Sequence, residues 1–587
     1  MQSKETKVKS KGLSFKDLSA RVFDSHEVSG LSPKSARLFL NGKLAKLVNG
    51  TARSISCSST RTFGCAFMSF GLFSLILHLL EYYFEETPTV ALSSLVISAI
   101  IALVSIPLLV VDRPMCNALQ EFPISDYILF EFFSIKRMRT DRTVNTLKPY
   151  VGVIVGIFPA LIGFFWSVEY VVLITLAIIF AVIAFISPEF PFLFTLLVLP
   201  YLPLVSYGSI VLVALSLLSL LSFWRKVLLG KRVYNFEAYD LGIILLLLIF
   251  AVGGAIYGGY SSTFNTGIMI SLLLGYIPAG NLVLNRRLAD CTVNSITVSS
   301  VPVAVVAIAQ YISAIFGSRI APVSSTFTSS DDLTVFLTVV SVIAIFYAHE
   351  EKEVLPKIFY STALILNLVA LIATENLFVV IVILLCALAY AILKAPAVPN
   401  ELIVIAAALP YALFLLPLET LMKICAFLGI PEGFTEIISD FSKTLSLFID
   451  NALLGVGARG FGEDVGYPAF NMLLGIGCRF GVFALLLFAL VMLLRLRHLS
   501  AFARYYKTSS ARVPIIMSAV AIFAFFVMGS LYDVFESTSL LYLFWCIMGF
   551  CSANLRIAKK EHNDRVDYYR DQRSFDSADT SILLHRK

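Results

Sequence analysis

The stretch NALLGVGARGFGEDVGYPAFNMLLGIGCRFGVFALLLFALVMLL, residues 451–494, joins a glycine-rich polar turn to a long apolar run. The apolar run has the length of a membrane-spanning helix, which needs about 20 mostly apolar residues. Glycine allows positive φ angles and close backbone packing. The glycines therefore predict a folded loop at the mouth of a membrane helix; they stand at positions 455, 457, 460, 462 and 466.

The composition of the whole chain is that of a polytopic membrane protein. Hydrophobic residues make up 58% of the 587 residues and charged residues 14%, against about half and a quarter in soluble domains. The first long apolar run begins near Cys65 without the features of a cleavable signal, so we expect an uncleaved anchor. The net charge of +6 is concentrated in loops and tails, which predicts membrane lipids and no nucleic acid as partners. The nine cysteines form no CxxC motif and no Cys/His cluster, so we expect no disulfide, no metal site and no cofactor.

The apolar segments predict an all-α fold with about 14–16 transmembrane helices. The number is open because prolines between residues 149 and 223 can break or merge helices. With sixteen spans, every cluster of Lys and Arg falls on one side, which predicts that both termini are cytoplasmic. The sixteen segments are 65–84, 89–111, 149–166, 169–187, 189–205, 206–223, 240–258, 264–284, 294–316, 332–348, 356–373, 377–393, 401–417, 468–494, 512–530 and 537–555.

These segments divide the chain into four predicted parts. The parts are a basic cytoplasmic tail (1–62), an extra transmembrane hairpin with a basic cytoplasmic linker (63–148), a main transmembrane domain (149–556) and a charged, disordered cytoplasmic tail (557–587). The main domain contains a long extracytoplasmic loop at 418–467, and loops of this length often carry function. Apolar residues at helical spacing between Glu432 and Ile449 predict a helix in this loop that lies on the membrane surface.

Three separated stretches resemble bacterial O-antigen ligase and O-antigen polymerase proteins. The first is RIAPVSSTFTSSDDLTVFL (319–337). The second is FIDNALLGVGARGF (448–461), which leads into AFNMLLGIGCRFG (469–481), and the third is LYDVFESTSLLYLFWCIMGFCSA (531–553). The positions that match the family pattern include Thr326, Phe327, Leu333, Leu337, Asn471, Leu474 and Gly481.

The resemblance covers about residues 190–555. It implies a metal-independent glycosyltransferase with a GT-C-like core in the bacterial cytoplasmic membrane. Such an enzyme works at the outer face of the membrane on a glycan carried by polyprenyl diphosphate. It transfers the glycan to an acceptor glycan or lipid, either as a polymerase, which we favour slightly, or as a ligase.

A diphosphate leaving group gains negative charge as the sugar–oxygen bond breaks. Without a metal, Arg or Lys must neutralise that charge. The candidates are Arg319 in the first outer loop, Arg459 in the glycine-rich turn and Arg479 within the apolar run. Each has a structural alternative; the partners would be lipid headgroups or Asp331 for Arg319, Glu463 or Asp464 for Arg459, and a buried carboxylate for Arg479.

The acceptor hydroxyl needs a group that takes its proton. Phe470 stands where the family commonly has His, and no histidine falls in an outer loop of the predicted topology. We therefore expect a carboxylate in this role; the candidates are Glu463, Asp464, Asp450, Asp533 and Glu536.

Four further residues are candidates for substrate binding. Phe461 and Tyr467 can stack on sugar faces or pack the loop onto the helix mouths. Asn471 can bind a sugar or cap the helix that follows it, and Thr326 lies in the first family-like stretch. Two other functions stay open, namely a flippase or transporter for lipid-linked oligosaccharide and, because of Phe470, a catalytically inactive scaffold for glycan assembly.

Overall fold

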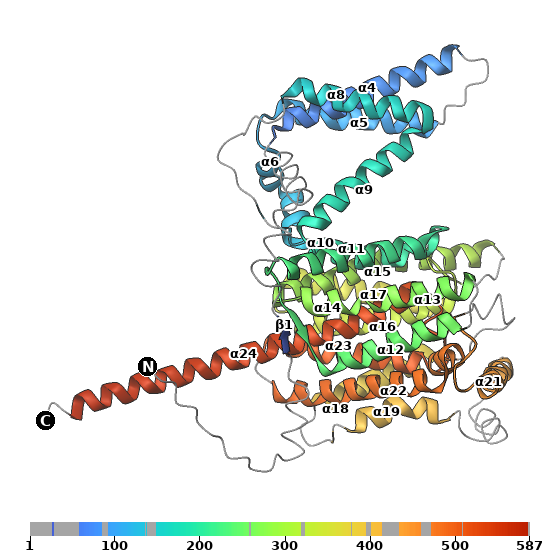
Figure 1. The fold of residues 1–587 in the computed structure, drawn as a ribbon, viewed down its shortest axis with the longest axis vertical. Coiled ribbons are helices and arrows are strands. Elements are labelled where there is room, and N and C mark those ends of the chain that lie inside the picture. Colours follow the sequence, from blue (N-terminus) through green and yellow to red (C-terminus); the bar gives the residue numbers. More distant parts are fainter. Residues whose placement is uncertain are drawn as a thin grey trace. The chain divides into compact units, whose positions relative to one another are not determined.

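The described part of the chain is mainly helical in the computed structural model (Figure 1). Two strands of three residues each form its one small sheet. The chain forms two compact units: unit 1 comprises Met1–Ser29, Thr195–Leu220 and Val233–Lys587, and unit 2 comprises Gly30–Phe194 and Leu221–Arg232. The structure describes residues 26–28, 58–84, 92–135, 137, 148–256, 260–317, 323–376, 378–394, 399, 401–413, 434–458, 471–506 and 509–584.

Within these ranges, eleven helical segments are long and apolar enough to cross a membrane, which supports the predicted helical membrane fold. They are Thr60–Phe84, Ser93–Val110, Val168–Ile186, Gly208–Leu228, Ala238–Ile256, Ser262–Leu282, Arg286–Gly317, Ser330–Glu350, Val354–Ala373, Met472–Tyr505 and Thr538–Val566. Shorter apolar helices are Pro149–Phe165, Glu189–Leu204, Phe378–Lys394, Glu401–Ala412 and Arg512–Met528. Together these segments overlap the sixteen predicted spans, and whether the shorter ones also cross a membrane stays a prediction.

Unit 2 is built around helix α4 (Thr60–Phe84), which packs against α5 (Leu92–Val110) and α8 (Pro149–Trp166). Glycine allows the close contact between α4 and α8, because a Cβ at Gly156 would lie 2.1 Å from the carbonyl oxygen of Ala66. Small residues have this role in many membrane helix pairs. The other elements of this unit are α6 (Met115–Glu121), α7 (Pro123–Ser125), η1 (Asp126–Phe132) and α9 (Val168–Ile186).

Unit 1 has its core at α23 (Arg512–Met528), where every residue from Pro514 to Met528 is buried. This helix is apolar on all sides, as expected for one that is enclosed by others. It contacts α16 (Ser330–Glu350), α18 (Phe378–Lys394), α22 (Met472–Tyr505) and α24 (Thr538–Leu584). The remaining elements are β1 (His26–Val28), η2 (Leu199–Leu204), β2 (Tyr234–Phe236), α12 (Ala238–Ile256), α13 (Tyr260–Leu273), α14 (Tyr276–Leu282), α15 (Arg286–Gly317), α17 (Val354–Ala373), α19 (Glu401–Leu413) and α21 (Phe434–Asp450), while α10 (Glu189–Val198) and α11 (Gly208–Leu228) have residues in both units.

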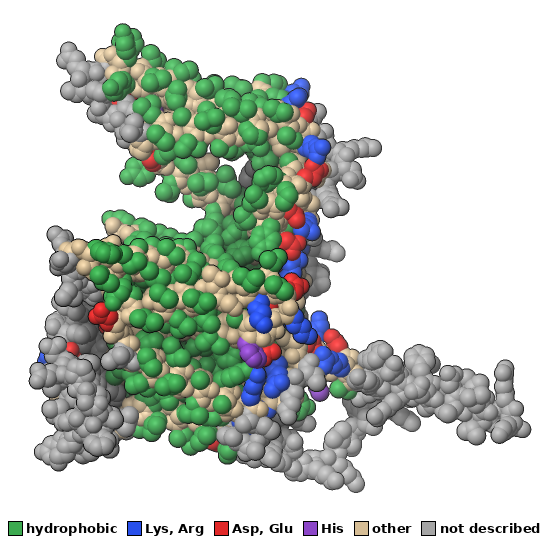
Figure 2. Space-filling view, turned by 180° about the vertical axis from the view of Figure 1, so that it is seen from behind, with side chains coloured by type: hydrophobic (Ala, Val, Ile, Leu, Met, Phe, Trp, Pro, Cys, Tyr) green, Lys and Arg blue, Asp and Glu red, His purple; other side chains and the backbone are tan. Residues whose placement is uncertain are grey.

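Basic residues of unit 1 gather at one end of its helices, which we call the basic end. Arg286 donates to the carbonyl of Ser510 at 3.0 Å, and Arg504 donates to the carbonyl of Ile392 at 2.7 Å. Between the ends, the exposed side chains are largely apolar, as Figure 2 shows. Several of the basic clusters predicted to share one side of the membrane are thus together in space, and the cytoplasmic location of that side stays a prediction.

The opposite end of unit 1, which we call the loop end, carries α21 (Figure 1). The helix predicted between Glu432 and Ile449 is confirmed there as α21, although its position on a membrane surface is not tested.

At the basic end the structure corrects the prediction of a disordered tail at 557–587, since α24 continues as a helix to Leu584. Glu561 accepts a hydrogen bond from the backbone N–H of Ser510 at 2.8 Å and lies four residues before Arg565, a spacing that favours helix.

Candidate functional site

Helix α22 is broken near its start, within the glycine-rich and apolar stretch 451–494. Gly481 has φ 83° and ψ 178°, which no helical residue adopts. The break leaves a short first segment of α22, Met472–Phe480. The last carbonyl groups of this segment have no N–H donors within the segment. Those carbonyls need partners from another segment.

The glycine-rich turn supplies the partners. The N–H of Val456 donates to the carbonyl of Cys478 at 2.7 Å, and the N–H of Gly457 donates to the carbonyl of Arg479 at 3.0 Å. Gly455 and Gly457 have φ angles of 74° and 85°, so the predicted use of glycine in this turn is confirmed at these two positions. The turn is therefore hydrogen-bonded into the break of the helix.

Arg479 lies two residues before the break and is buried, with 4% of its surface exposed. Its Nη1 lies 2.6 Å from Oδ2 of Asp533, in the segment between α23 and α24. Burial raises the pKa of Asp533, and the charge of Arg479 opposes that rise. Arg479 thus pairs with a buried carboxylate, which the sequence analysis gave as the alternative to diphosphate binding. This pairing does not test whether Arg479 also binds a substrate.

Glu536 is close enough to this ion pair to interact with both charges. The Glu536 side chain is exposed, but the surrounding protein removes part of its hydration, and this raises its pKa. The negative charge of Asp533 raises the pKa of Glu536 further, whereas the positive charge of Arg479 opposes the rise. A carboxylate with a raised pKa is a better proton acceptor near neutral pH. We call Arg479, Asp533 and Glu536 the loop-end cluster.

Neighbouring elements hold the loop-end cluster in place. Nδ2 of Asn376, between α17 and α18, donates to the hydroxyl of Tyr532 at 2.7 Å. A Cβ at Gly475 would lie 2.7 Å from Oδ2 of Asp533, so a glycine there leaves room for the carboxylate. Asn471 accepts from the N–H of Leu474 at 2.8 Å and caps α22, which was one of its two predicted roles.

The structure places only part of the predicted site. Thr326 is buried near the start of α16, and its Oγ1 has no hydrogen-bond partner among the described residues. Asp450 ends α21. The other candidates lie outside the described residues; they are Arg319, Arg459, Phe461, Glu463, Asp464 and Tyr467.

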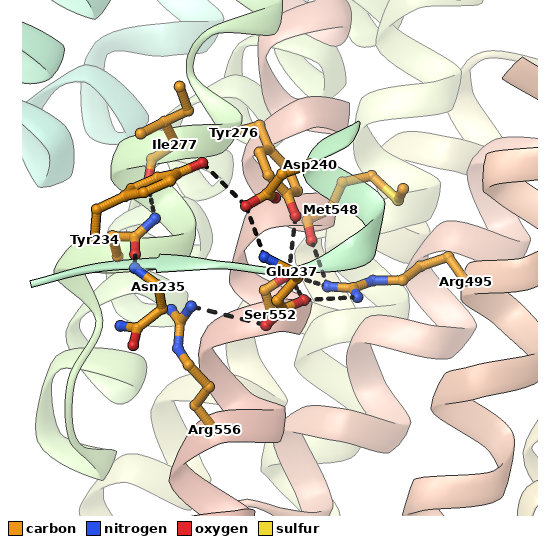
Figure 3. Close-up of polar contacts among 11 residues, drawn as sticks. Tyr234, Asn235, Glu237, Asp240, Tyr276, Ile277, Arg495, Met548, Ser552 and Arg556 are labelled. Atoms are coloured by element: carbon orange, nitrogen blue, oxygen red, sulfur yellow. Dashed lines mark hydrogen bonds and ion pairs between the residues drawn. The ribbon is translucent and has the colours of Figure 1, made fainter. Parts of the chain in front are cut away.

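A second group of buried charges lies further along α22, toward its C-terminal end (Figure 3). Arg495 is fully buried, and its Nη1 lies 3.3 Å from Oε2 of Glu237, the residue between β2 and α12. Arg556 of α24 approaches the other oxygen of Glu237 at 3.7 Å, and the Ser552 hydroxyl donates to Oε2 at 2.9 Å. Asp240 accepts from the N–H of Glu237 at 2.9 Å. We call Glu237, Asp240, Arg495, Ser552 and Arg556 the basic-end network.

The basic-end network keeps Glu237 ionised. Burial alone would raise the pKa of Glu237, but Arg495, Arg556 and the Ser552 hydroxyl hold it below its ordinary value. The guanidinium of Arg495 also lies 4.6 Å from the ring centroid of Tyr239, a cation–π contact. The network therefore joins the start of α12 to α22 and α24 through ion pairs and a hydrogen bond.

Sequence reasoning missed this network because it ended the span at Leu494. Arg495 was then one of several basic residues in a cytoplasmic loop, whereas α22 runs on to Tyr505. The usable signal was that Arg495 directly follows an apolar run without a helix-ending Gly or Pro. No protein-family model matches this chain, and no curated protein matches it either. The resemblance to O-antigen ligase and polymerase proteins is therefore carried by the three stretches of sequence alone.

Proposed function

We propose that this chain is a glycosyltransferase of the O-antigen ligase and polymerase type, with a GT-C-like core of about 14–16 membrane helices. Its donor would be a glycan linked to polyprenyl diphosphate, and its acceptor another glycan or a lipid at the outer face of the bacterial cytoplasmic membrane. The observation that carries the proposal is the break in α22, into which the glycine-rich turn is hydrogen-bonded beside the buried Arg479. Broken membrane helices with ordered irregular backbone are typical of binding sites within membranes.

In this proposal the proton of the acceptor hydroxyl goes to Glu536. The hydroxyl oxygen bonds to the anomeric carbon of the donor sugar while the bond from that carbon to the diphosphate oxygen breaks. Polyprenyl diphosphate leaves with the bonding electrons, and the Glu536 carboxylate accepts the hydroxyl proton. Glu536 suits this role because it is exposed to an incoming acceptor and has a raised pKa.

Arg479 would stabilise the leaving diphosphate, together with Arg319 and Arg459 from the adjoining loops. An arriving diphosphate would raise the pKa of Asp533 further, and this pKa is already raised by burial. Uptake of a proton by Asp533 would then release the guanidinium of Arg479 to the phosphate oxygens. Asp533 is thus a positioning residue, which keeps Arg479 oriented before the donor binds.

The proposal is tested with purified protein in vesicles that carry a short polyprenyl-diphosphate-linked glycan. The wild type should release polyprenyl diphosphate and form a longer or transferred glycan, both measured by chromatography. Glu536→Gln should lower the rate by about 10²- to 10⁴-fold, the usual contribution of a general base. The control is Glu401→Gln, since Glu401 is an exposed carboxylate paired with Arg497 at 3.3 Å, and its rate should not change. A wild type that forms no new glycosidic bond would refute the function, and an unchanged Glu536→Gln rate would refute the base.

A transporter for the same lipid-linked glycan is the second candidate. It is favoured by the buried ion pairs near both ends of α22, Arg479 with Asp533 and Arg495 with Glu237, because such pairs can act as two alternating gates. The same vesicles separate the two functions when the glycan starts in the inner leaflet. Movement of the glycan to the outer leaflet without new bonds would support the transporter, and neither movement nor bond formation would favour the inactive scaffold.

A further inference from the structure

The N-terminal segment forms a strand on the edge of β2. Strand β1 (His26–Val28) pairs antiparallel with β2 (Tyr234–Phe236), with Glu27 opposite Asn235. The sequence predicted only a basic tail for residues 1–62. A segment from this tail therefore has a defined place in unit 1.

The hydrogen bonds of β2 show which of its edges accepts β1. The N–H of Asn235 donates to Oδ1 of Asn281 in α14 at 3.0 Å, so it points away from β1. In an antiparallel pair, hydrogen-bonded and non-hydrogen-bonded positions alternate. Glu27 and Asn235 are thus a non-hydrogen-bonded pair, and the backbone groups of Tyr234 and Phe236 face β1. Without β1 these groups would form an open strand edge, which is a template for an extended peptide.

Strand β2 also leads directly into the basic-end network. Glu237 is the next residue after Phe236, and its carboxylate lies between Arg495 and Arg556. Tyr234, within β2, donates from its hydroxyl to Asp240 at 3.0 Å. A shift of β2 would therefore move the acidic residues of the network away from their basic partners on α22 and α24.

We propose that residues 26–28 dock on β2 of the same chain and hold the basic-end network closed. About 30 residues connect β1 to α4, enough to reach about 100 Å when extended, so the chain length permits docking within one molecule. The docked strand is a regulatory contact, because any event that removes it exposes the edge of β2 and loosens the contacts of Glu237. This inference does not depend on the chemistry of the loop end.

Cross-linking tests the docking. The Glu27→Cys/Asn235→Cys double variant should form a disulfide, because non-hydrogen-bonded partners have Cα atoms about 4.5 Å apart. A specific protease site inserted after Gly42 allows detection, since a disulfide keeps the N-terminal fragment attached under non-reducing conditions. The matched control is Val28→Cys/Asn235→Cys, because adjacent strand residues point to opposite faces and should not bridge. Cross-linked dimers would indicate that the strand is exchanged between two copies, and this result would overturn the proposal. The absence of any disulfide would overturn it as well.

The reactivity of a native cysteine tests the effect on the network. Cys551 is fully buried beside Ser552, whereas Cys386 is buried in α18 outside the network. Val28→Pro should raise the rate of Cys551 modification by a small methanethiosulfonate at least about tenfold, because it removes an N–H that bonds across the strand pair. Glu27→Pro, at the non-hydrogen-bonded position, should have a smaller effect, and Cys386 should not change. Peptide mass spectrometry reads both sites, and an unchanged Cys551 rate would overturn the proposal.

Discussion

The two ends of α22 hold a buried arginine in different ways. At the basic end, Arg495 lies in regular helix and shares Glu237 with Arg556 and Ser552. At the loop end, Arg479 lies beside a break in the helix and faces Asp533, while Glu536 adds a further negative charge. About 21 Å of unbroken helix separates the break at Gly481 from Arg495 at 1.5 Å per residue.

Glu237 at the basic end and the two carboxylates of the loop-end cluster respond oppositely to their surroundings. The pKa of Glu237 is lowered, because two arginines and a hydroxyl outweigh the effect of burial. The pKa values of Asp533 and Glu536 are raised, because their loss of hydration is not fully offset by Arg479. Glu237 is therefore held in its ionised form, whereas the surroundings of Asp533 and Glu536 favour their protonated forms. Perturbed carboxylates of the second kind are more typical of functional sites.

The largest expected effect comes from removing Arg495. Arg495→Ala leaves Glu237 buried with only the more distant Arg556 as its charged partner. Breaking a buried ion pair in this way costs about 3–5 kcal/mol, so the unfolding temperature in detergent should fall strongly. Arg497→Ala is the matched control, since Arg497 and its partner Glu401 are mostly exposed and such pairs contribute about 1 kcal/mol or less. Similar unfolding temperatures for both variants would contradict the contrast between the network and the surface pairs.

The contrast between the two ends also shows what the sequence could and could not predict. The spans were predictable because long apolar runs in a charge-poor chain have few alternatives to membrane helices. The use of glycine at 455 and 457 was predictable because closely spaced glycines are typical of a tight turn with positive φ angles. Arg479 was singled out correctly as a charge within an apolar run, but its partner Asp533 lies more than fifty residues further along the chain. A single sequence does not show which of many carboxylates meets it.

Other features lay beyond sequence reasoning for a different reason. The break at Gly481 follows from contacts with a turn that ends more than twenty residues earlier, and a glycine within a helical run is usually tolerated without a break. Strand β1 has only three residues, which is too short for a period-two pattern. Glu237 reads as an ordinary loop residue until α22 and α24 bring Arg495 and Arg556 to it.

A smaller effect is expected at the break in α22. Gly481→Ala should destabilise the protein by about 1–3 kcal/mol, because its φ of 83° is strained for any other residue. A Cβ there would also lie 2.1 Å from the carbonyl oxygen of Leu453, so the turn would have to move. Gly267→Ala is the control; Gly267 lies in α13 with no atom within 4 Å of the added Cβ, and alanine should be neutral or slightly stabilising there. Thermal unfolding measures both variants, and limited proteolysis of residues 451–458 should accelerate in Gly481→Ala alone.

The smallest effect should be that of pH, where Glu237 contributes with the opposite sign to Asp533 and Glu536. Asp533 and Glu536 have raised pKa values, so their stability contribution is complete at low pH and is lost as the pH rises through those values. Glu237 has a lowered pKa, so its contribution is present above its ordinary value of 4.5 and is lost as the pH falls through its folded-state pKa. From pH 7.5 to 4.5 the loop end should thus raise the unfolding temperature, and further acidification should lower it through the basic end. Compared with the wild type, Glu536→Gln should flatten the rise of the unfolding temperature between pH 7.5 and 4.5. Glu237→Gln should flatten the fall of the unfolding temperature at lower pH. If Glu536→Gln instead flattened the fall at acid pH, the assignment of opposite roles to the two ends of α22 would be wrong.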